Sequence, residues 1–232
     1  LLTACSGHND TQQVATAARV QHSISSAYAP AHFNLDQRAA LIKGVSSELR
    51  ALMEAHANQR NIPGVAYGVV VDDSLVLADA TGLLNLETEQ PAAPTSAFRI
   101  ASMTKSFTAM AILKLRDAGK LSLSDPAEKY ISEMQSLEYL TSDTPIITIE
   151  NLLTMTAGFP EDNPWGDRQL SEPNSMLTGM MLEGVSFSNP ASLQYEYSNT
   201  GFALLGQIIT RVSGKPYQEY ITAEIPKPLE MT

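Results

Sequence analysis

The chain has 232 residues, enough for one sizeable domain or one and a fraction. Hydrophobic residues make up 44% and charged residues 17%, which is typical of a globular protein and excludes a disordered or fibrous chain. The net charge of −10 argues against a nucleic-acid partner, because phosphates repel an acidic surface. A single cysteine excludes an internal disulfide framework, and no Cys/His cluster has the spacing of a zinc site.

The first residues, LLTACS, resemble the end of a bacterial lipoprotein signal, in which small residues precede a cysteine. In this interpretation Cys5 is lipidated, and its acyl chains anchor an otherwise soluble protein. We therefore expect a bacterial cell-envelope protein, on the periplasmic or extracellular side, that meets the membrane only through the lipid anchor at Cys5. The alternative is a chance run of apolar and small residues. Residues 1–35 are predicted to be a signal remnant and a flexible tether, because 6–35 show no helical or strand period.

The folded part begins with a predicted helix and a hairpin. Residues 36–60 are predicted to form one long amphipathic helix that ends before Pro63 and Gly64. Residues 65–71 and 75–80 are predicted strands, and the turn at 72–74 makes them an antiparallel hairpin. Residues 82–97 are polar and proline-rich and indicate a loop. The helix prediction depends on one apolar stripe: Leu41, Ile42, Val45, Leu49, Leu52 and Met53.

The remainder of the chain is predicted to be helical with irregular joints. A long helix runs from about residue 102 to Gly119, and shorter helices over 148–157 and 201–213 end at Gly158 and Gly214. Residues 158–175 are predicted to be a surface loop, and a last helix begins at Pro216. Two strands followed by helices favour an α+β fold with a separate helical subdomain. Two strands are too few for a stable sheet, so we expect the chain to be truncated and further strands to lie beyond residue 232.

A serine and a lysine stand out at the start of the helix that begins near residue 102. Ser102 and Lys105 are three residues apart and therefore share a helix face. Lys105 is the only charge in a largely apolar stretch, which predicts that this helix is buried. A lysine so placed can accept a proton, and a serine hydroxyl beside it can become a nucleophile. The alternative is a helix-capping serine beside a lysine that reaches solvent.

Four segments together resemble the serine β-lactamase and penicillin-binding-protein superfamily. They are FRIASMTKSF at 98–107, GKLSLSDP at 119–126, ITIENLLTMTAG at 147–158 and YSNTGFALLG at 197–206. The likeness runs in order from about residue 61 to 232. It is closest to the branch that contains class C β-lactamases, D-Ala-D-Ala carboxypeptidases, D-amino-acid peptidases and related esterases. The resemblance implies the β-lactamase/transpeptidase-like fold, an antiparallel sheet flanked by helices plus a helical subdomain, with residues 36–232 as its amino-terminal part.

The resemblance also implies roles for four residues. Ser102 matches the nucleophile that forms an acyl-enzyme, and Lys105 matches the lysine that helps to remove its proton. Tyr197 matches the tyrosine that shuttles protons, and Asn199 matches the asparagine that binds the lysine or the substrate. Tyr195 is a rival for the tyrosine, but only Tyr197 has an asparagine two positions later.

Two departures from the family pattern matter. The family carries a third motif, K-T-G or H-x-G, whose strand supplies half of the oxyanion hole, but here Lys215 is followed by Pro216. Loss of one oxyanion donor costs about 3 kcal/mol, so we expect this chain to be inactive or barely active and its longer parent to be the enzyme. Ser124-Asp125-Pro126 lacks the asparagine of the class A element S-D-N. We interpret it as a turn whose Ser124 or Asp125 caps the next helix.

The sequence therefore predicts a serine hydrolase that acts through an acyl-enzyme on Ser102. The expected partner is a small molecule or peptide with a reactive carbonyl: an ester, a D-amino-acid peptide or a β-lactam. An ester or peptide is preferred over a β-lactam. Acyl transfer by serine needs no metal or organic cofactor, so none is expected. The alternative from another class is a non-catalytic binding or sensor protein of the same fold.

Overall fold

A computed structural model describes residues 35–162 and 173–231 of the chain. Cys5 and nearly all of the predicted tether lie outside the described residues. By its internal contacts the chain divides into two compact units, Leu1–Phe98 and Arg99–Thr232, and each is described by itself. Within the described ranges, no helix is long and apolar enough to cross a bilayer.

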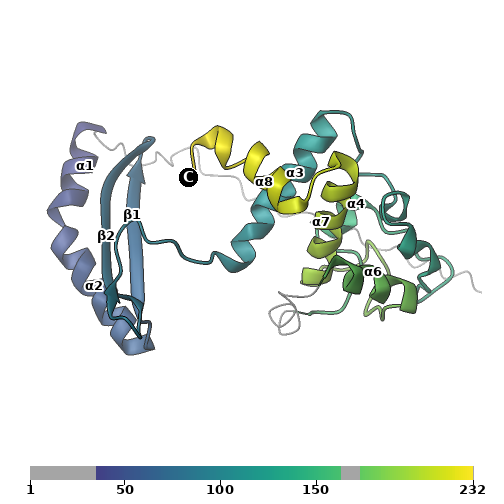
Figure 1. The fold of residues 1–232 in the computed structure, drawn as a ribbon, viewed down its shortest axis with the longest axis horizontal. Helices are drawn as coiled ribbons and strands as arrows, with labels where there is room; N and C mark the ends of the chain where they lie inside the picture. Colours follow the sequence, from purple (N-terminus) through teal and green to yellow (C-terminus); the bar gives the residue numbers. More distant parts are fainter. Residues whose placement is uncertain (1–34, 163–172, 232) are drawn as a thin grey trace, which may run out of the picture. The chain divides into compact units, whose positions relative to one another are not determined.

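The first unit is a small antiparallel sheet covered by helices (Figure 1). Its helices are α1 (Leu35–Gly44) and α2 (Ser46–Arg60). The sheet has the order β1-β2-β3 and is built from β1 (Gly64–Val71), β2 (Ser74–Asn85) and β3 (Gln90–Pro91). The predicted hairpin is therefore confirmed. The end of β2 and all of β3 fall in the range predicted to be loop.

The hairpin turn follows from two aspartates. Asp72 and Asp73 both have positive φ, 47° and 64°, and they connect the paired residues Val71 and Ser74. A two-residue turn with two positive φ values matches the right-handed twist of the strands, and aspartate tolerates that backbone region better than most residues. This local chemistry sets the pairing of β1 with β2.

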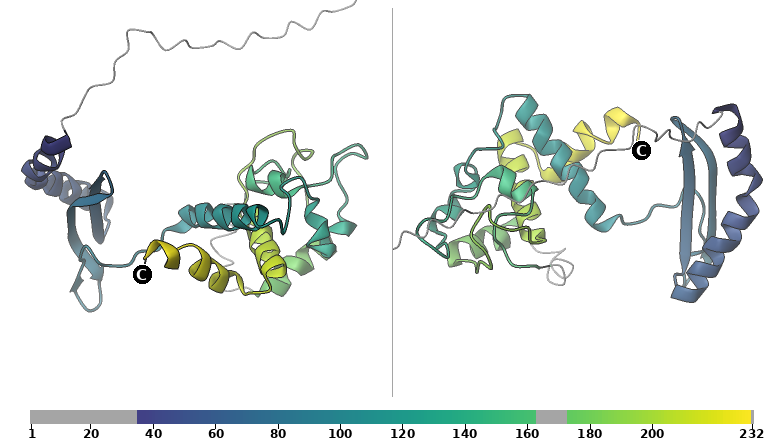
Figure 2. Two further views of the ribbon diagram at one scale, coloured as in Figure 1. Left: turned by 90° about the horizontal axis from the view of Figure 1, so that it is seen from above. Right: turned by 180° about the vertical axis from the view of Figure 1, so that it is seen from behind.

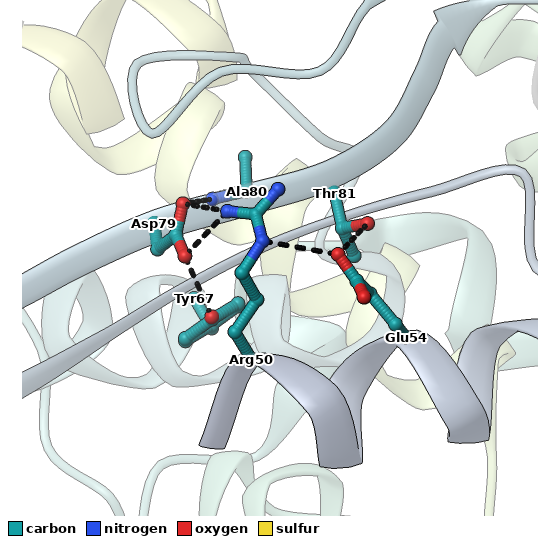
Figure 3. Close-up of polar contacts among 6 residues, drawn as sticks. All are labelled: Arg50, Glu54, Tyr67, Asp79, Ala80 and Thr81. Carbon is teal, nitrogen blue, oxygen red and sulfur yellow. Dashed lines mark hydrogen bonds and ion pairs between the residues drawn. The ribbon is translucent and has the colours of Figure 1, made fainter. Parts of the chain in front are cut away.

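A polar network joins α2 to the sheet (Figure 3). Arg50 on α2 donates to both carboxylate oxygens of Asp79 on β2, at 2.7 Å each, and pairs with Glu54 at 3.0 Å. Tyr67 on β1 donates to Asp79 at 2.9 Å, and Thr81 donates to Glu54 at 3.3 Å. The network therefore fixes the register of the helix on the hairpin.

The prediction of one helix over 36–60 is wrong in two respects. The helix is interrupted at Val45, directly after Gly44, the residue that costs a helix interior about 1 kcal/mol. The apolar stripe also does not face one surface. Leu41 and Leu52 are more than 60% exposed, and Val45 is 52% exposed. An apolar pattern marks residues that can be buried, but it does not show which of them meet the sheet.

The second unit is helical in its described residues and holds a large apolar core. The two views of Figure 2 show α3 packed with α7 and α8. Side chains without solvent exposure on α7 include Leu204, Leu205, Ile208 and Ile209, which share one helix face. In chain order the helices are α3 (Thr104–Asp117), α4 (Ile149–Leu153), α6 (Asn174–Glu183), α7 (Asn199–Ser213) and α8 (Tyr217–Glu224).

The helix that follows Ser102 is only partly buried. Ala111, Ile112 and Leu115 of α3 are buried, but Met103 before it and Met110 on it are 64% and 39% exposed. The prediction of burial on most sides is therefore wrong for the described part of the chain. Composition alone indicates an apolar helix, whereas burial depends on which neighbours reach it.

Candidate active site

Ser102 lies in a short 3-10 helix, Ala101–Met103, immediately before α3. The residue before it, Ala101, has a φ of +45°, in the left-handed region that a residue with a Cβ rarely adopts. Such strained backbone persists only where the surroundings hold it, and it is frequent at functional sites. Ser102 itself is exposed. Its hydroxyl is therefore accessible to a substrate.

Lys105 is in the first turn of α3, one turn after Ser102, as its spacing predicts. Its Nζ lies 3.5 Å from the Ser102 Oγ and is partly shielded from solvent. The ammonium also lies 4.7 Å from the centre of the Tyr197 ring, within the range of a cation–π contact. The lysine therefore has contacts on two sides and does not extend freely into solvent.

Tyr197 and Asn199 reach the same point from the segment that leads into α7. The Tyr197 hydroxyl lies 2.6 Å from the Ser102 Oγ and accepts a hydrogen bond from Lys105 Nζ at 2.7 Å. Asn199 Oδ1 accepts from the same Nζ at 2.5 Å. The structure therefore brings together the four residues predicted from two short motifs more than 90 positions apart. Tyr195, the rival, is 60% exposed and is no partner of Ser102 or Lys105.

This arrangement links a hydroxyl to a cation through a phenol. The distance from Ser102 to Tyr197 is shorter by 0.9 Å than the distance from Ser102 to Lys105 (2.6 against 3.5 Å). A proton that leaves the serine therefore has the tyrosine oxygen as its nearest acceptor. Lys105 Nζ lies 2.7 Å from that same oxygen.

Two acidic residues near this cluster were missed by the sequence prediction. Asp162 accepts hydrogen bonds from the backbone N–H groups of Asn199 and Thr200, at 2.6 and 2.7 Å. Glu196 accepts from the backbone N–H of Glu161 at 2.9 Å. A hydrogen bond from the Ser188 hydroxyl, followed by that backbone N–H, lowers the pKa of Glu196 below its ordinary value. No local spacing marks either acid, because their partners are distant in sequence.

A pocket of about 340 Å³ adjoins Asp162 and the start of α7. It is largely apolar and also includes the carboxylate of Glu183. The lining residues are Phe159, Pro160, Asp162, Met180, Glu183, Gly184, Val185, Ser186 and Thr200.

The segment Ser124-Asp125-Pro126 forms a turn, but neither of its polar residues caps the helix that follows. The next 3-10 helix, Ala127–Lys129, has Pro126 at its cap and no side-chain cap. Asp125 instead accepts from the Tyr130 hydroxyl and the Ser122 N–H, and these bonds lower its pKa. Within the described ranges, no group of three or more His, Cys, Asp or Glu side chains is placed to hold a metal ion.

Comparison with known proteins places the chain in a family. The Beta-lactamase family model matches residues 49–232. Protein flp of Staphylococcus aureus is 33% identical over 187 residues, which are 80% of this chain and 37% of that protein. The octameric penicillin-binding protein homologue from Pyrococcus abyssi is 32% identical, with a TM-score of 0.68 over 80% of this chain and 43% of that one. A class C beta lactamase, 24% identical, has a TM-score of 0.69 over 86% of this chain and 52% of that one.

The chain belongs to the beta-lactamase family, within the serine β-lactamase and penicillin-binding-protein superfamily. Its fold is β-lactamase/transpeptidase-like, with helices and a small antiparallel sheet, which confirms the α+β prediction. A hydrolase with promiscuous acyltransferase activity, 21% identical, and a D-amino acid amidase from Ochrobactrum anthropi, 24% identical, share this fold. The chain spans 37% of the Staphylococcus protein and 43% of the Pyrococcus chain.

Proposed function

We propose that the protein is a serine hydrolase that forms an acyl-enzyme on Ser102. The observation that carries this proposal is the contact of one tyrosine hydroxyl with both Ser102 Oγ, at 2.6 Å, and Lys105 Nζ, at 2.7 Å. A nucleophile, a proton acceptor and a group that orients that acceptor, each within hydrogen-bond reach of the next, form the arrangement that covalent catalysis by serine requires.

The proposed reaction has two halves. The Ser102 Oγ attacks the substrate carbonyl carbon while its proton passes to the Tyr197 oxygen, which acts as the base beside Lys105. The tetrahedral intermediate then breaks the bond to the leaving group, which takes the proton from Tyr197. In the second half, water attacks the acyl-serine carbonyl and gives a proton to Tyr197, and the released Ser102 Oγ takes that proton back. Asn199 holds Lys105 throughout.

We propose an ester or a D-amino-acid amide as substrate in preference to a β-lactam. This choice follows from the sequence, which combines Ser-Met-Thr-Lys with Tyr-Ser-Asn. Two structural neighbours have the same fold. One is a hydrolase with promiscuous acyltransferase activity, 21% identical, and another is a D-amino acid amidase, 24% identical, so both support the fold alone. The contacts of Ser102 with Tyr197 and of Tyr197 with Lys105 fit a substrate that has a reactive carbonyl.

The test is intact-mass spectrometry after exposure to a fluorophosphonate and, in a separate sample, to a penicillin. We expect a covalent adduct that disappears in Ser102→Ala. Hydrolysis rates for a short p-nitrophenyl ester and for nitrocefin then separate an esterase from a β-lactamase. An adduct without turnover of either substrate by the longer parent would favour the alternative, a binding or sensor protein. The proposal is contradicted if neither this chain nor its longer parent reacts with either probe, or if the mutant reacts equally well.

We also propose that Cys5 is lipidated in the native protein. The support is the sequence around it, and the consequence is attachment to the cell envelope. Mass spectrometry of the amino-terminal peptide from native cells would show the mass of the acyl groups, and a Cys5→Ser variant would lose both that mass and the membrane fraction. An unmodified cysteine in the native peptide would exclude the anchor.

A further inference from the structure

The segment Glu196–Thr200 carries two of the four candidate residues but has little regular structure of its own. Tyr197 and Ser198 precede α7, and Asn199 is the first residue of that helix. If this segment moved, the tyrosine oxygen and the asparagine oxygen would leave Ser102 and Lys105 together. The bonds that hold the segment therefore decide whether the site is assembled.

Asp162 holds the helical end of the segment. Its Oδ1 accepts from the Asn199 N–H at 2.6 Å, and its Oδ2 accepts from the Thr200 N–H at 2.7 Å and from the Thr200 hydroxyl at 2.6 Å. The Ser198 hydroxyl donates to Asp162 Oδ2 at 3.4 Å and accepts from the Gly201 N–H at 3.0 Å. The serine is thus the ordinary helix cap, and Asp162 binds the two N–H groups that this cap leaves free. A carboxylate at a helix amino terminus is further favoured by the helix dipole.

Glu196 holds the other end. Its Oε1 accepts from the Glu161 N–H at 2.9 Å, and its Oε2 accepts from Asn189 Nδ2 at 2.8 Å and from the Ser188 hydroxyl. Its own N–H donates to the Met155 carbonyl at 2.9 Å. Glu196 and Asp162 thus join the same two segments in opposite directions. The segment 161–162 gives an N–H to Glu196 and a carboxylate to Asn199 and Thr200, so the two segments are bonded on both sides of Tyr197.

We propose that Asp162 and Glu196 are positioning residues that fix Tyr197 and Asn199 against Ser102 and Lys105. This inference rests on the proposed function of Ser102. Charged acceptors suit the task because hydrogen bonds to a carboxylate are shorter and stronger than neutral ones. Their effect on rate arises from geometry, since a displacement of about 1 Å in a catalytic group can cost about a hundredfold.

The experiment measures the rate at which a fluorophosphonate labels Ser102 in the full chain, by intact mass. Asp162→Ala removes all four hydrogen bonds that the carboxylate accepts and should slow labelling by about tenfold to a hundredfold. Asp162→Asn keeps the shape and one acceptor oxygen, and it should fall between wild type and alanine. Glu196→Gln keeps the acceptor for the Glu161 N–H and should lose less than Glu196→Ala.

Thr148→Ala is the matched control. Thr148 caps α4 by accepting from the Asn151 N–H at 3.2 Å, so its loss removes a helix cap without touching the Glu196–Thr200 segment. It should lower the melting temperature and leave the labelling rate within about twofold of wild type. Amide exchange gives a second readout, because the Asn199 and Thr200 N–H groups should exchange faster in Asp162→Ala than in Thr148→Ala.

The outcomes separate the two proposals. If neither the wild-type chain nor its longer parent is labelled, the function proposed for Ser102 is contradicted. The positioning roles are overturned if wild type, Asp162→Asn and Glu196→Gln are all labelled at the same rate. They are also overturned if the alanine variants of Asp162 and Glu196 lose no more labelling rate than Thr148→Ala. If an alanine variant does not fold by circular dichroism, the isosteric Asn and Gln variants decide the result.

Discussion

Three side chains lie within hydrogen-bond distance of Lys105 Nζ. Lys105 Nζ donates to Tyr197 at 2.7 Å and to Asn199 at 2.5 Å, but its distance to Ser102 is 3.5 Å, at the limit of a hydrogen bond. The lysine is therefore committed to the tyrosine and the asparagine. In the proposed mechanism, its effect on the serine therefore passes mainly through the tyrosine oxygen.

Tyr197→Phe tests this reading directly. The variant keeps the ring but removes the hydroxyl that joins Ser102 to Lys105, so we expect Ser102 acylation to slow by about a hundredfold to ten-thousandfold. Tyr195→Phe is the matched control, because Tyr195 is 60% exposed, lies two residues earlier and should leave the rate unchanged. Stopped-flow or mass-resolved labelling measures both. An equal rate in Tyr197→Phe and wild type would make Lys105 the direct acceptor.

At the residue scale, sequence alone could identify the four candidate residues but not the residues that hold them in place. Ser102 and Lys105 are a helix turn apart, and Tyr197 and Asn199 form a second short motif, so each pair is visible locally. Asp162 cannot be found from local sequence in this way, because its partners, Asn199 and Thr200, are more than 35 positions away. Its role depends on a loop that the fold brings to α7.

At the scale of elements, one glycine sets the loop that leads to Asp162. Gly158 has a φ of +84°, and a Cβ there would lie 2.0 Å from the backbone oxygen of Asn189. Gly158→Ala should therefore destabilise the protein by about 2 kcal/mol or more, because a backbone atom cannot move aside cheaply. It should also slow Ser102 labelling, since Asn189 donates to Glu196.

Gly119→Ala separates the two causes of that loss. Gly119 also has a positive φ, +68°, but a Cβ there would meet nothing within 4 Å. We expect a cost of about 1 kcal/mol from the backbone alone, and no change in labelling. Urea denaturation gives both free energies of unfolding. Equal costs for the two variants would show that the contact with Asn189 relaxes.

An ion pair joins α7 to the 3-10 helix η3 (Ser132–Ser136). Arg211 on α7 donates to both oxygens of Glu133, at 2.8 and 2.7 Å, and this pairing lowers the pKa of Glu133 to about 2. A depressed carboxyl pKa adds stability above its unfolded value of 4.5, and that stability is lost as the pH falls from 4.5 through about 2.

Arg211→Met should therefore lower the free energy of unfolding by about 1 kcal/mol near pH 7, a modest figure because solvent screens a partly exposed pair. The difference from wild type should shrink as the pH falls below about 4.5. Chemical denaturation at several pH values measures it. A difference independent of pH would show that Arg211 acts through packing, not through its charge.

Element boundaries followed from sequence only where local chemistry sets them. The β1–β2 turn at Asp72 and Asp73 and the end of α7 at Gly214 were both predicted, because turn and cap residues act within a few positions. The α1–α2 break and the partial exposure of α3 were not. Each depends on which surfaces meet, and apolar periodicity marks a face without showing its partner.

At the scale of the whole molecule, the four candidate residues and both proposed positioning residues belong to one unit, Arg99–Thr232. The other unit has its own ion-pair network, in which hydrogen bonds from Arg50, then from the Ala80 N–H and Tyr67, lower the pKa of Asp79. Each unit thus has a carboxylate whose depressed pKa links its stability to acid, and the two pairs share no residue.

When acid unfolding is measured separately in each unit, a substitution in one unit should therefore change the unfolding of that unit alone. Arg50→Met removes the main cause of the low Asp79 pKa, so peptides from residues 35–98 should lose protection from hydrogen exchange at a higher pH than in wild type. Arg211→Met should do the same for peptides from the second unit. In the double variant both shifts should appear with their single-variant sizes, because effects at sites without shared partners add. A shift of both units by either single substitution would instead show that the two units unfold as one cooperative body, and the Ser102 site would then depend on the Arg50–Asp79 pair as well.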